Sequence, residues 1–211
     1  MRENARHMAD SAVLLLYREL ELTKFPICPE KLIRSVKNCA FISYEELAKA
    51  GGVSVGDVIR ANRSADGCTH YDAARGRYLV AVNTSGRSEG RIRWTEAHEL
   101  GHIATGHFLE IAKKGRLGTT EDEAEEEADY FASSLLAPFA AIRLLHAKCT
   151  EDVADFFGLS MTAAASRWKE YLRDKPGDPA LEAWFSKRVP KTDGRVYRFR
   201  TDRAIDIWPD L

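Results

Sequence analysis

The sequence has little of what marks membrane, secreted or polyanion-coating proteins. Its longest apolar run, Ala12 to Tyr17, is much shorter than the roughly 20 residues that a membrane-spanning helix needs. Its 31 Lys and Arg nearly balance its 32 Asp and Glu, which argues against binding to nucleic acid or anionic membranes through bulk charge. The four cysteines form no CxxC pair, so neither a disulfide framework nor a cysteine-based zinc site is expected. We therefore expect reduced thiols, a cytoplasmic location and no membrane partner.

Length and composition are those of an ordinary globular protein. Of 211 residues, 45% are hydrophobic and 30% are charged, and a chain of this length can bury a core without help from disulfides or metals. The segment 174–179 holds two prolines and a glycine, as linkers do. We predict one domain over residues 1–173, with a helical part at 139–173. A C-terminal tail follows at 174–211, in which residues 196–199 have the pattern of an edge strand.

Apolar periodicity and capping signals predict an α+β fold that is mainly helical. Helices are expected at 8–22, from Pro29 onward, from Ser43 to Gly51, and at 91–107, 120–137, 150–157 and 161–173. The stretch 67–82 differs, because two runs rich in β-forming residues flank a turn and predict a hairpin, hence a small antiparallel sheet. The helices at 150–157 and 161–173 are separated by a glycine-bearing turn, which gives them the outline of a helix-turn-helix.

The most informative motif is H-E-x-x-H at residues 98–102, within a predicted helix. Positions i and i+4 share one helix face, so His98 and His102 can direct ring nitrogens to a single zinc ion. Glu99 lies beside the first of these histidines and can take a proton from zinc-bound water. The same letters also occur on helices that bind no metal, so a third ligand is needed to support the interpretation.

A catalytic zinc ion usually has three protein ligands and one open position. The acidic helix predicted at 120–137 offers several carboxylates. Its buried stripe is marked by Ala124, Ala128, Phe131 and Leu135. Glu125 and Asp129, one turn apart, flank this stripe, whereas an acidic first turn is typical of a solvated helix start. We predict Glu125 as the third ligand, with Asp129 accepting a hydrogen bond from the non-coordinating nitrogen of a ligand histidine.

With these residues, the sequence resembles the ImmA/IrrE family of zinc metallopeptidases. The resemblance covers about residues 8–173 and is specific across 91–138, where the segments 91–102, 125–132 and 135–138 match. It implies an α+β metallopeptidase fold and one zinc ion. The implied ligands are His98, His102 and Glu125, with Glu99 as the catalytic base. Two departures leave this set intact: Asp129 stands where many members have Asn, and Ala137 where Met is common.

The resemblance also implies a function. Some members cleave a helix-turn-helix repressor of a mobile element or a stress response, so we expect a zinc-dependent endopeptidase with a protein substrate of this kind. A second electrophile usually helps to hold the oxyanion. Tyr130, His107 and His70 are candidates among which the sequence does not choose, and His107 can equally be a polar residue near a helix end.

A DNA-binding or partner-binding regulator with a non-catalytic zinc site is the alternative function. The segment 150–173 has a helix-turn-helix outline, yet its second helix begins with Met161, Thr162 and Ala163, which do not read base edges as Arg, Asn or Gln do. We therefore expect no direct binding to nucleic acid. A purely structural zinc site is normally closed by four protein ligands, whereas three are identified here, which favours an open, catalytic position.

Overall fold

The structure of the protein is a computed structural model that describes residues 3–115, 120–173 and 178–188. The strand predicted at 196–199 lies outside the described residues. The fold is α+β and mainly helical, as the sequence predicts. In chain order the helices and strands are α1 (Glu3–Glu19), α2 (Pro29–Ser35), β1 (Cys39–Ser43), α3 (Tyr44–Gly51), α4 (Val55–Asn62), β2 (Gly67–Asp72), β3 (Arg77–Val82), α5 (Glu89–Ala104), α6 (His107–Lys114), α7 (Glu121–Leu136), α8 (Phe139–Leu144), α9 (Thr150–Phe157), α10 (Met161–Arg173) and α11 (Pro179–Arg188).

The sheet contains the predicted hairpin and one strand more. β2 and β3 pair antiparallel, and β1 pairs parallel to β3, which gives the order β1-β3-β2. The sheet is therefore mixed rather than purely antiparallel. β1 was missed because its five residues fall between two helices and are too few to establish an alternating pattern. Between β1 and β3 the chain passes through α3, α4 and β2, the kind of long crossover that a parallel pair requires.

Local capping chemistry sets most of the helix boundaries that bear on the site. Ser43 and Glu46 begin α3 with a capping box, and Thr120 and Glu123 begin α7 in the same way, both as predicted. The helix predicted at 91–107 is α5, which ends at Ala104, and an additional helix, α6, follows it. Gly106 has a left-handed conformation (φ 76°), so the chain turns after α5 and starts α6 at His107.

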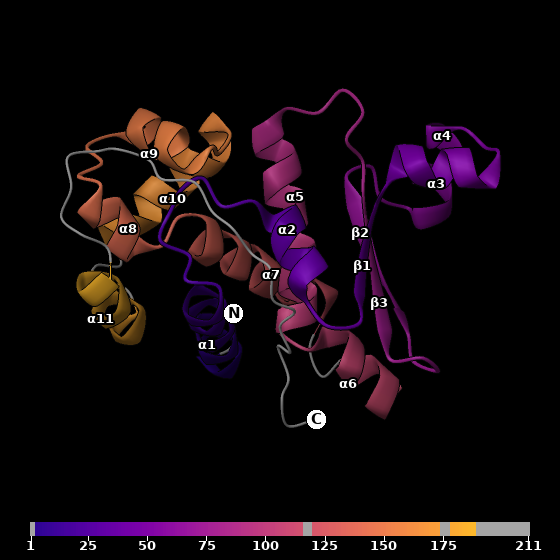
Figure 1. The fold of residues 1–211 in the computed structure, drawn as a ribbon, viewed down its shortest axis with the longest axis horizontal. Helices are drawn as coiled ribbons and strands as arrows, with labels where there is room; N and C mark the ends of the chain where they lie inside the picture. Colours follow the sequence, from indigo (N-terminus) through magenta and orange to yellow (C-terminus); the bar gives the residue numbers. More distant parts are fainter. Residues whose placement is uncertain (1–2, 116–119, 174–177, 189–211) are drawn as a thin grey trace.

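α5 occupies the centre of the molecule. Figure 1 shows it between the sheet on one side and α7, α1 and the C-terminal helices on the other. Its side chains at Ala97, Leu100, Ile103 and Ala104 are at most 1% exposed. Because α5 is held on both sides, the residues that it carries toward its remaining open face have fixed positions. Of the helices that the structure describes, none is long and apolar enough to cross a membrane.

The helix α11 belongs to the segment that the sequence sets apart as a tail. Leu181, Trp184 and Phe185 of this helix are buried in the main core. The rings of Trp184 and Phe185 lie 5.6 and 5.1 Å from that of Tyr17 in α1. Residues 179–188 thus pack on the same core as α1, and the proposed boundary at residue 173 remains a prediction.

Candidate metal centre

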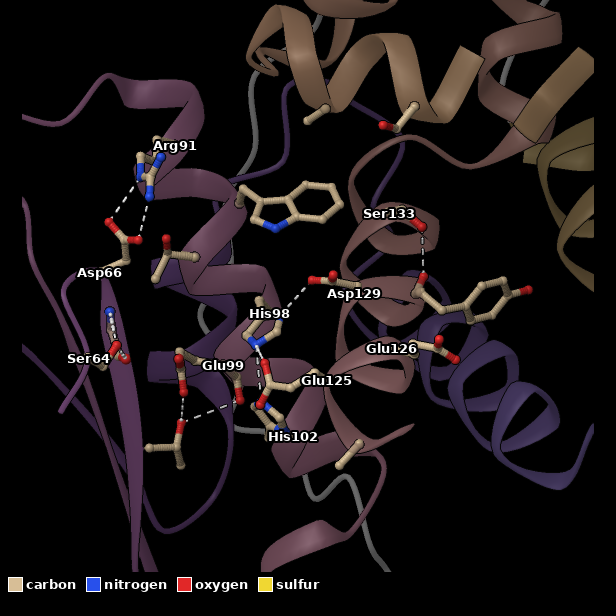
Figure 2. A pocket seen from close by; sticks show the side chains of 18 of the residues that line it. Ser64, Asp66, Arg91, His98, Glu99, His102, Glu125, Glu126, Asp129 and Ser133 are labelled. Carbon is tan, nitrogen blue, oxygen red and sulfur yellow. Dashed lines mark hydrogen bonds and ion pairs between the residues drawn. The ribbon is translucent and has the colours of Figure 1, made fainter. Parts of the chain in front are cut away.

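The two histidines of the H-E-x-x-H motif and Glu125 come from two facing helices. His98 and His102 lie one turn apart on α5, and Glu125 lies in the second turn of α7 (Figure 2). The helices approach closely where α5 carries Gly101, because a Cβ atom there would lie 2.9 Å from the carbonyl oxygen of Ala128. This close approach brings the carboxylate of α7 within reach of both imidazoles.

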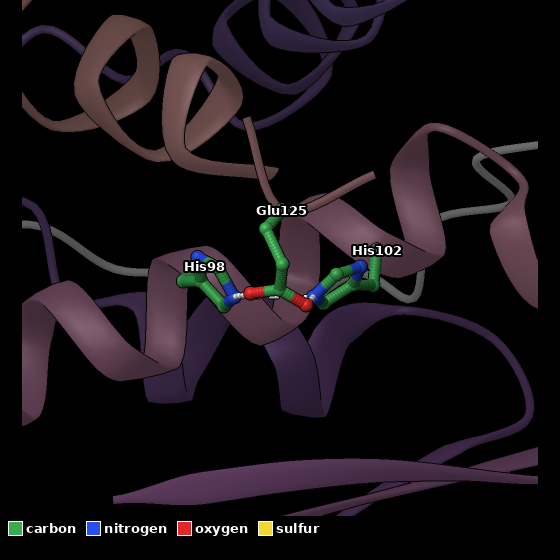
Figure 3. Close-up of side chains that lie close together, drawn as sticks. All are labelled: His98, His102 and Glu125. Carbon is green, nitrogen blue, oxygen red and sulfur yellow. Dashed lines mark hydrogen bonds and ion pairs between the residues drawn. The ribbon is translucent and has the colours of Figure 1, made fainter. Parts of the chain in front are cut away.

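The three side chains point at one another (Figure 3). His98 Nε2 lies 3.1 Å from His102 Nε2 and 3.1 Å from Glu125 Oε2, and His102 Nε2 lies 3.4 Å from Glu125 Oε1. Donor atoms about 2.0–2.1 Å from one ion at tetrahedral angles are about 3.3 Å apart. The separation of the two Nε2 atoms, and the distance from each to its nearer Glu125 oxygen, are close to that spacing, so the three side chains could hold a zinc-like ion.

The electrostatics of the cluster favour positive charge between the three groups. Burial lowers the pKa of His98, but its hydrogen bonds to Asp129 and Glu125 outweigh this effect and raise the pKa to about 10. The two histidines hold the pKa of Glu125 far below its usual range. A cation between the two imidazoles and the carboxylate would supply this positive charge, and a metal ion would supply it without protonating the imidazoles.

Glu99 faces the opposite side of the same cleft, toward the sheet. The residue is 7% exposed, and its Oε2 accepts a hydrogen bond from the Thr69 hydroxyl of β2 at 2.8 Å. Burial raises the pKa of Glu99, and the Thr69 hydrogen bond opposes that rise. The side chain is thus held in place beside the histidines while it does not join their cluster.

The two ligand candidates on α5 each have a partner at the ring nitrogen that faces away from the cluster. His98 Nδ1 lies 2.8 Å from Asp129 Oδ1, one turn along α7 from Glu125. His102 Nδ1 lies 3.0 Å from His107 Nδ1, at the start of α6. Both imidazoles are therefore oriented from behind, and each by a different kind of group.

The structure disperses the three candidates for the oxyanion electrophile. The Tyr130 hydroxyl donates to Asp10 at 2.8 Å and accepts from Arg6 at 3.1 Å, both on α1. His107 is 4% exposed and lies behind His102. His70 Nε2 lies 2.9 Å from Asn62 Oδ1 of α4. Tyr130 and His107 line the same cleft as the cluster, His107 in contact with His102, whereas His70 does not, and the role of all three stays a prediction.

A cleft of about 1580 Å³ contains the cluster. Beyond α5 and α7, its walls come from the edge strand β2 and from α10. Residues on these added walls include Gly67, Cys68, Thr69, Thr162, Ser166 and Glu170. The contribution of α10 was missed because its polar face, with residues at helical spacing, looks in the sequence like an ordinary solvated surface.

Comparison with protein families identifies the chain. The family model described as Peptidase_M78, IrrE N-terminal-like domain, matches residues 57–169. The chain belongs to this family. The Peptidase_M78 match confirms the family resemblance found in the sequence and includes α5 and α7 in full. A metallopeptidase-type function follows from it. A search among curated proteins finds no match.

Within this Peptidase_M78 domain, the pair α9–α10 packs its turn onto α5. The guanidinium of Arg93 donates to the carbonyl oxygen of Gly158, and a Cβ atom on Gly90 would lie 2.7 Å from the amide nitrogen of Ser160. Arg167 of α10 is 4% exposed, and its Nε donates to the carbonyl oxygen of Ala137 at 2.8 Å. The helix pair is thus part of the cleft wall, and its arginine at the centre of α10 is engaged in the core.

Proposed function

We propose that the protein is a zinc-dependent endopeptidase of the H-E-x-x-H type. The observation that carries the proposal is the convergence of His98, His102 and Glu125 at distances close to those of tetrahedral ligands, with the buried Glu99 beside them in one cleft. Two imidazoles and one carboxylate, with a fourth position left for water, are a donor set of catalytic zinc sites.

The residues around the cluster have complementary roles in this proposal. When bound, zinc supplies Lewis-acid activation of the water and of the scissile carbonyl. Glu99 accepts the proton of the attacking water and delivers it to the leaving amine. Thr69 holds the carboxylate of Glu99 in position through its 2.8 Å hydrogen bond. Asp129 accepts the Nδ1 proton of His98, which leaves Nε2 of that ring free to bind the metal.

The shape of the cleft supports a polypeptide as the substrate. Its volume of about 1580 Å³ exceeds the roughly 300–1,000 Å³ of small-molecule pockets. β2 ends the sheet order, so its outer edge faces the cleft with no strand paired to it among the described residues. An extended peptide can hydrogen-bond to such an edge. From the family resemblance, we propose that the natural substrate is a helix-turn-helix repressor of a mobile element or a stress response.

The packing of α9–α10 argues against the DNA-binding alternative. A recognition helix must enter the major groove with its first turns exposed and with side chains free to contact bases and phosphates. Here the turn is packed on α5, and Arg167 is buried. One face of α10, with Thr162, Ser166 and Glu170, borders the peptidase cleft.

Zinc content and cleavage test the proposal together. Elemental analysis of the purified protein should find one zinc ion per chain, and Glu125→Ala should lose most of it. The neighbouring exposed residue provides a matched control, so Glu126→Gln should retain the metal. Glu99→Gln should also retain zinc while peptide cleavage falls about 10²- to 10⁴-fold. Absence of zinc from the wild-type protein after reconstitution near neutral pH would overturn the proposal.

A further inference from the structure

A further histidine and a further glutamate lie directly behind the candidate metal centre. His107 Nδ1 is 3.0 Å from His102 Nδ1, and His107 Nε2 is 3.0 Å from Glu127 Oε2. The side chains of His107 and Glu127 are 5% and 2% exposed. A carboxylate buried this deeply is costly unless its charge is compensated and its oxygens accept hydrogen bonds. The burial of His107 and Glu127 therefore calls for a specific role, because neither side chain is part of a solvated charged surface.

Three helices converge to form this arrangement. His102 ends the motif on α5, the left-handed Gly106 turns the chain back, and His107 begins α6 beneath the ring of His102. Glu127 follows Glu125 by two residues on α7. Two residues rotate a helix by about 200°, so the two carboxylates approach the centre from different sides. Glu125 contacts the Nε2 atoms of His98 and His102, whereas Glu127 contacts His107, which lies behind His102.

The neighbours of His107 determine where its protons are. Its Nε2 lies 3.1 Å from Thr105 Oγ1 and 3.0 Å from Glu127 Oε2. The Thr105 hydroxyl donates its own proton to the carbonyl oxygen of Gly101 at 2.8 Å. With Glu127 ionised, both groups near Nε2 are acceptors, and His107 then carries a proton on Nε2.

The remaining choice concerns the contact between the two Nδ1 atoms, where one proton lies between two nitrogens. If His102 donates, its Nε2 is unprotonated and can bind the metal. If His107 donates, His107 is an imidazolium paired with Glu127, and His102 carries its proton on Nε2, where it blocks the metal. Metal binding is thus compatible with only one direction of this hydrogen bond.

We propose that His107 and Glu127 are positioning residues that hold His102 in its metal-binding tautomer. The hydrogen bonds run from His102 Nδ1–H to His107 Nδ1 and from His107 Nε2–H to Glu127. The buried carboxylate thereby contributes negative charge toward the ion through two imidazoles. The inference rests on the proposed function, because it assumes that His102 is a metal ligand. It distinguishes the two histidines of the motif, since His98 is oriented directly by the half-exposed Asp129 and His102 through a buried relay.

The tautomers give a test that does not depend on activity. Long-range ¹H–¹⁵N spectra of the zinc-loaded protein should show His102 protonated on Nδ1 only and His107 on Nε2 only. A His107 protonated on both nitrogens would overturn the relay even if zinc is bound.

Metal affinity gives the second test. With Zn²⁺ in competition with a chelator, Glu127→Gln and His107→Leu should each weaken binding about 10- to 100-fold. Glu126→Gln removes the same charge from an exposed neighbour and should change affinity less than twofold. His107→Asn retains an acceptor in the place of Nδ1 and should recover part of the loss seen in His107→Leu.

The outcomes separate this inference from the proposed function. Tight zinc binding by the wild type and by Glu127→Gln alike would overturn the relay and leave the peptidase proposal standing. Failure of the wild type to bind zinc would overturn both. If the His107 variants fail to fold, the wild-type tautomers decide the matter alone.

Discussion

Gly101 offers a direct test of how α5 and α7, the two helices that carry the candidate metal ligands, are held together. It lies inside the H-E-x-x-H motif, on the face of α5 that meets α7. In a helix, replacing Gly with Ala normally stabilises by about 0.8–1.0 kcal/mol, because alanine loses less backbone entropy on folding. Helix propensity alone therefore predicts that Gly101→Ala is stabilising.

Packing opposes that gain and exceeds it. The added Cβ atom would lie 2.9 Å from the carbonyl oxygen of Ala128, 3.0 Å from its Cα and 3.2 Å from Cδ1 of Phe131. Two of these atoms belong to the backbone of α7, so no side-chain rotation relieves the overlap. Overpacking of this kind costs about 1–3 kcal/mol. Subtracting the propensity gain leaves a net cost of about 0–2 kcal/mol, and we expect Gly101→Ala to lie toward the upper end because the overlap is with backbone atoms.

Thermal unfolding of the metal-free protein would measure the effect. At about 2–4 °C per kcal/mol for a chain of this size, Gly101→Ala should lower Tm by several degrees. Gly56→Ala in α4 is the matched control, because its Cβ atom meets nothing closer than 3.5 Å. That variant should leave Tm unchanged or raise it slightly. Zinc affinity should also fall in Gly101→Ala, because α7 carries Glu125. A Gly101→Ala protein as stable as Gly56→Ala, with unchanged affinity, would refute the close-packing argument.

Three further predictions concern other parts of the chain. Burial, with the nearby charge of Glu30, raises the pKa of Glu96 from 4.5 to about 7, so the folded state binds this proton more tightly than the unfolded state does. The free energy of unfolding should therefore fall by about 3 kcal/mol as pH rises from about 4.5 to about 7. Urea unfolding would measure this decline, which Glu96→Gln should abolish. Asp129→Ala should weaken Zn²⁺ binding tenfold or more in a chelator competition. Trp184→Ala should lower the free energy of unfolding by about 3–5 kcal/mol, whereas exposed Leu172→Ala should change it by less than about 0.5 kcal/mol.

The parts of the fold that could be predicted from the sequence are those set by local chemistry. The capping boxes at Ser43 and Thr120 locate the starts of α3 and α7, and the alternation around a turn locates the β2–β3 hairpin. β1 escaped prediction because a five-residue parallel strand depends on a partner far along the chain. α5 ends close to the predicted boundary at residue 107, but the left-handed turn at Gly106 also starts α6, and that helix depends on tertiary packing.

The candidate site likewise has residues that local sequence patterns predict and contacts that depend on tertiary packing. The spacing of His98 and His102 is a property of one helix, so the pair was predictable from the motif. The selection of Glu125 and Asp129 used the apolar phase of α7, and the structure brings both to the histidines as ring partners. No local pattern predicts that the Tyr130 hydroxyl turns to Asp10 of α1, because that contact joins residues 120 positions apart.

The run Glu125-Glu126-Glu127 shows why tertiary packing has to decide such questions. The three residues are chemically identical, and successive positions on a helix point about 100° apart. Once α5 docks on α7, Glu125 meets the two imidazoles, Glu126 remains exposed at the cleft, and Glu127 becomes 1% exposed behind His102. Neutralising each glutamate in turn should therefore have three different consequences for the metal. Glu125→Gln should remove a ligand, Glu126→Gln should leave affinity unchanged, and Glu127→Gln should weaken binding through the tautomer of a ligand that it does not touch.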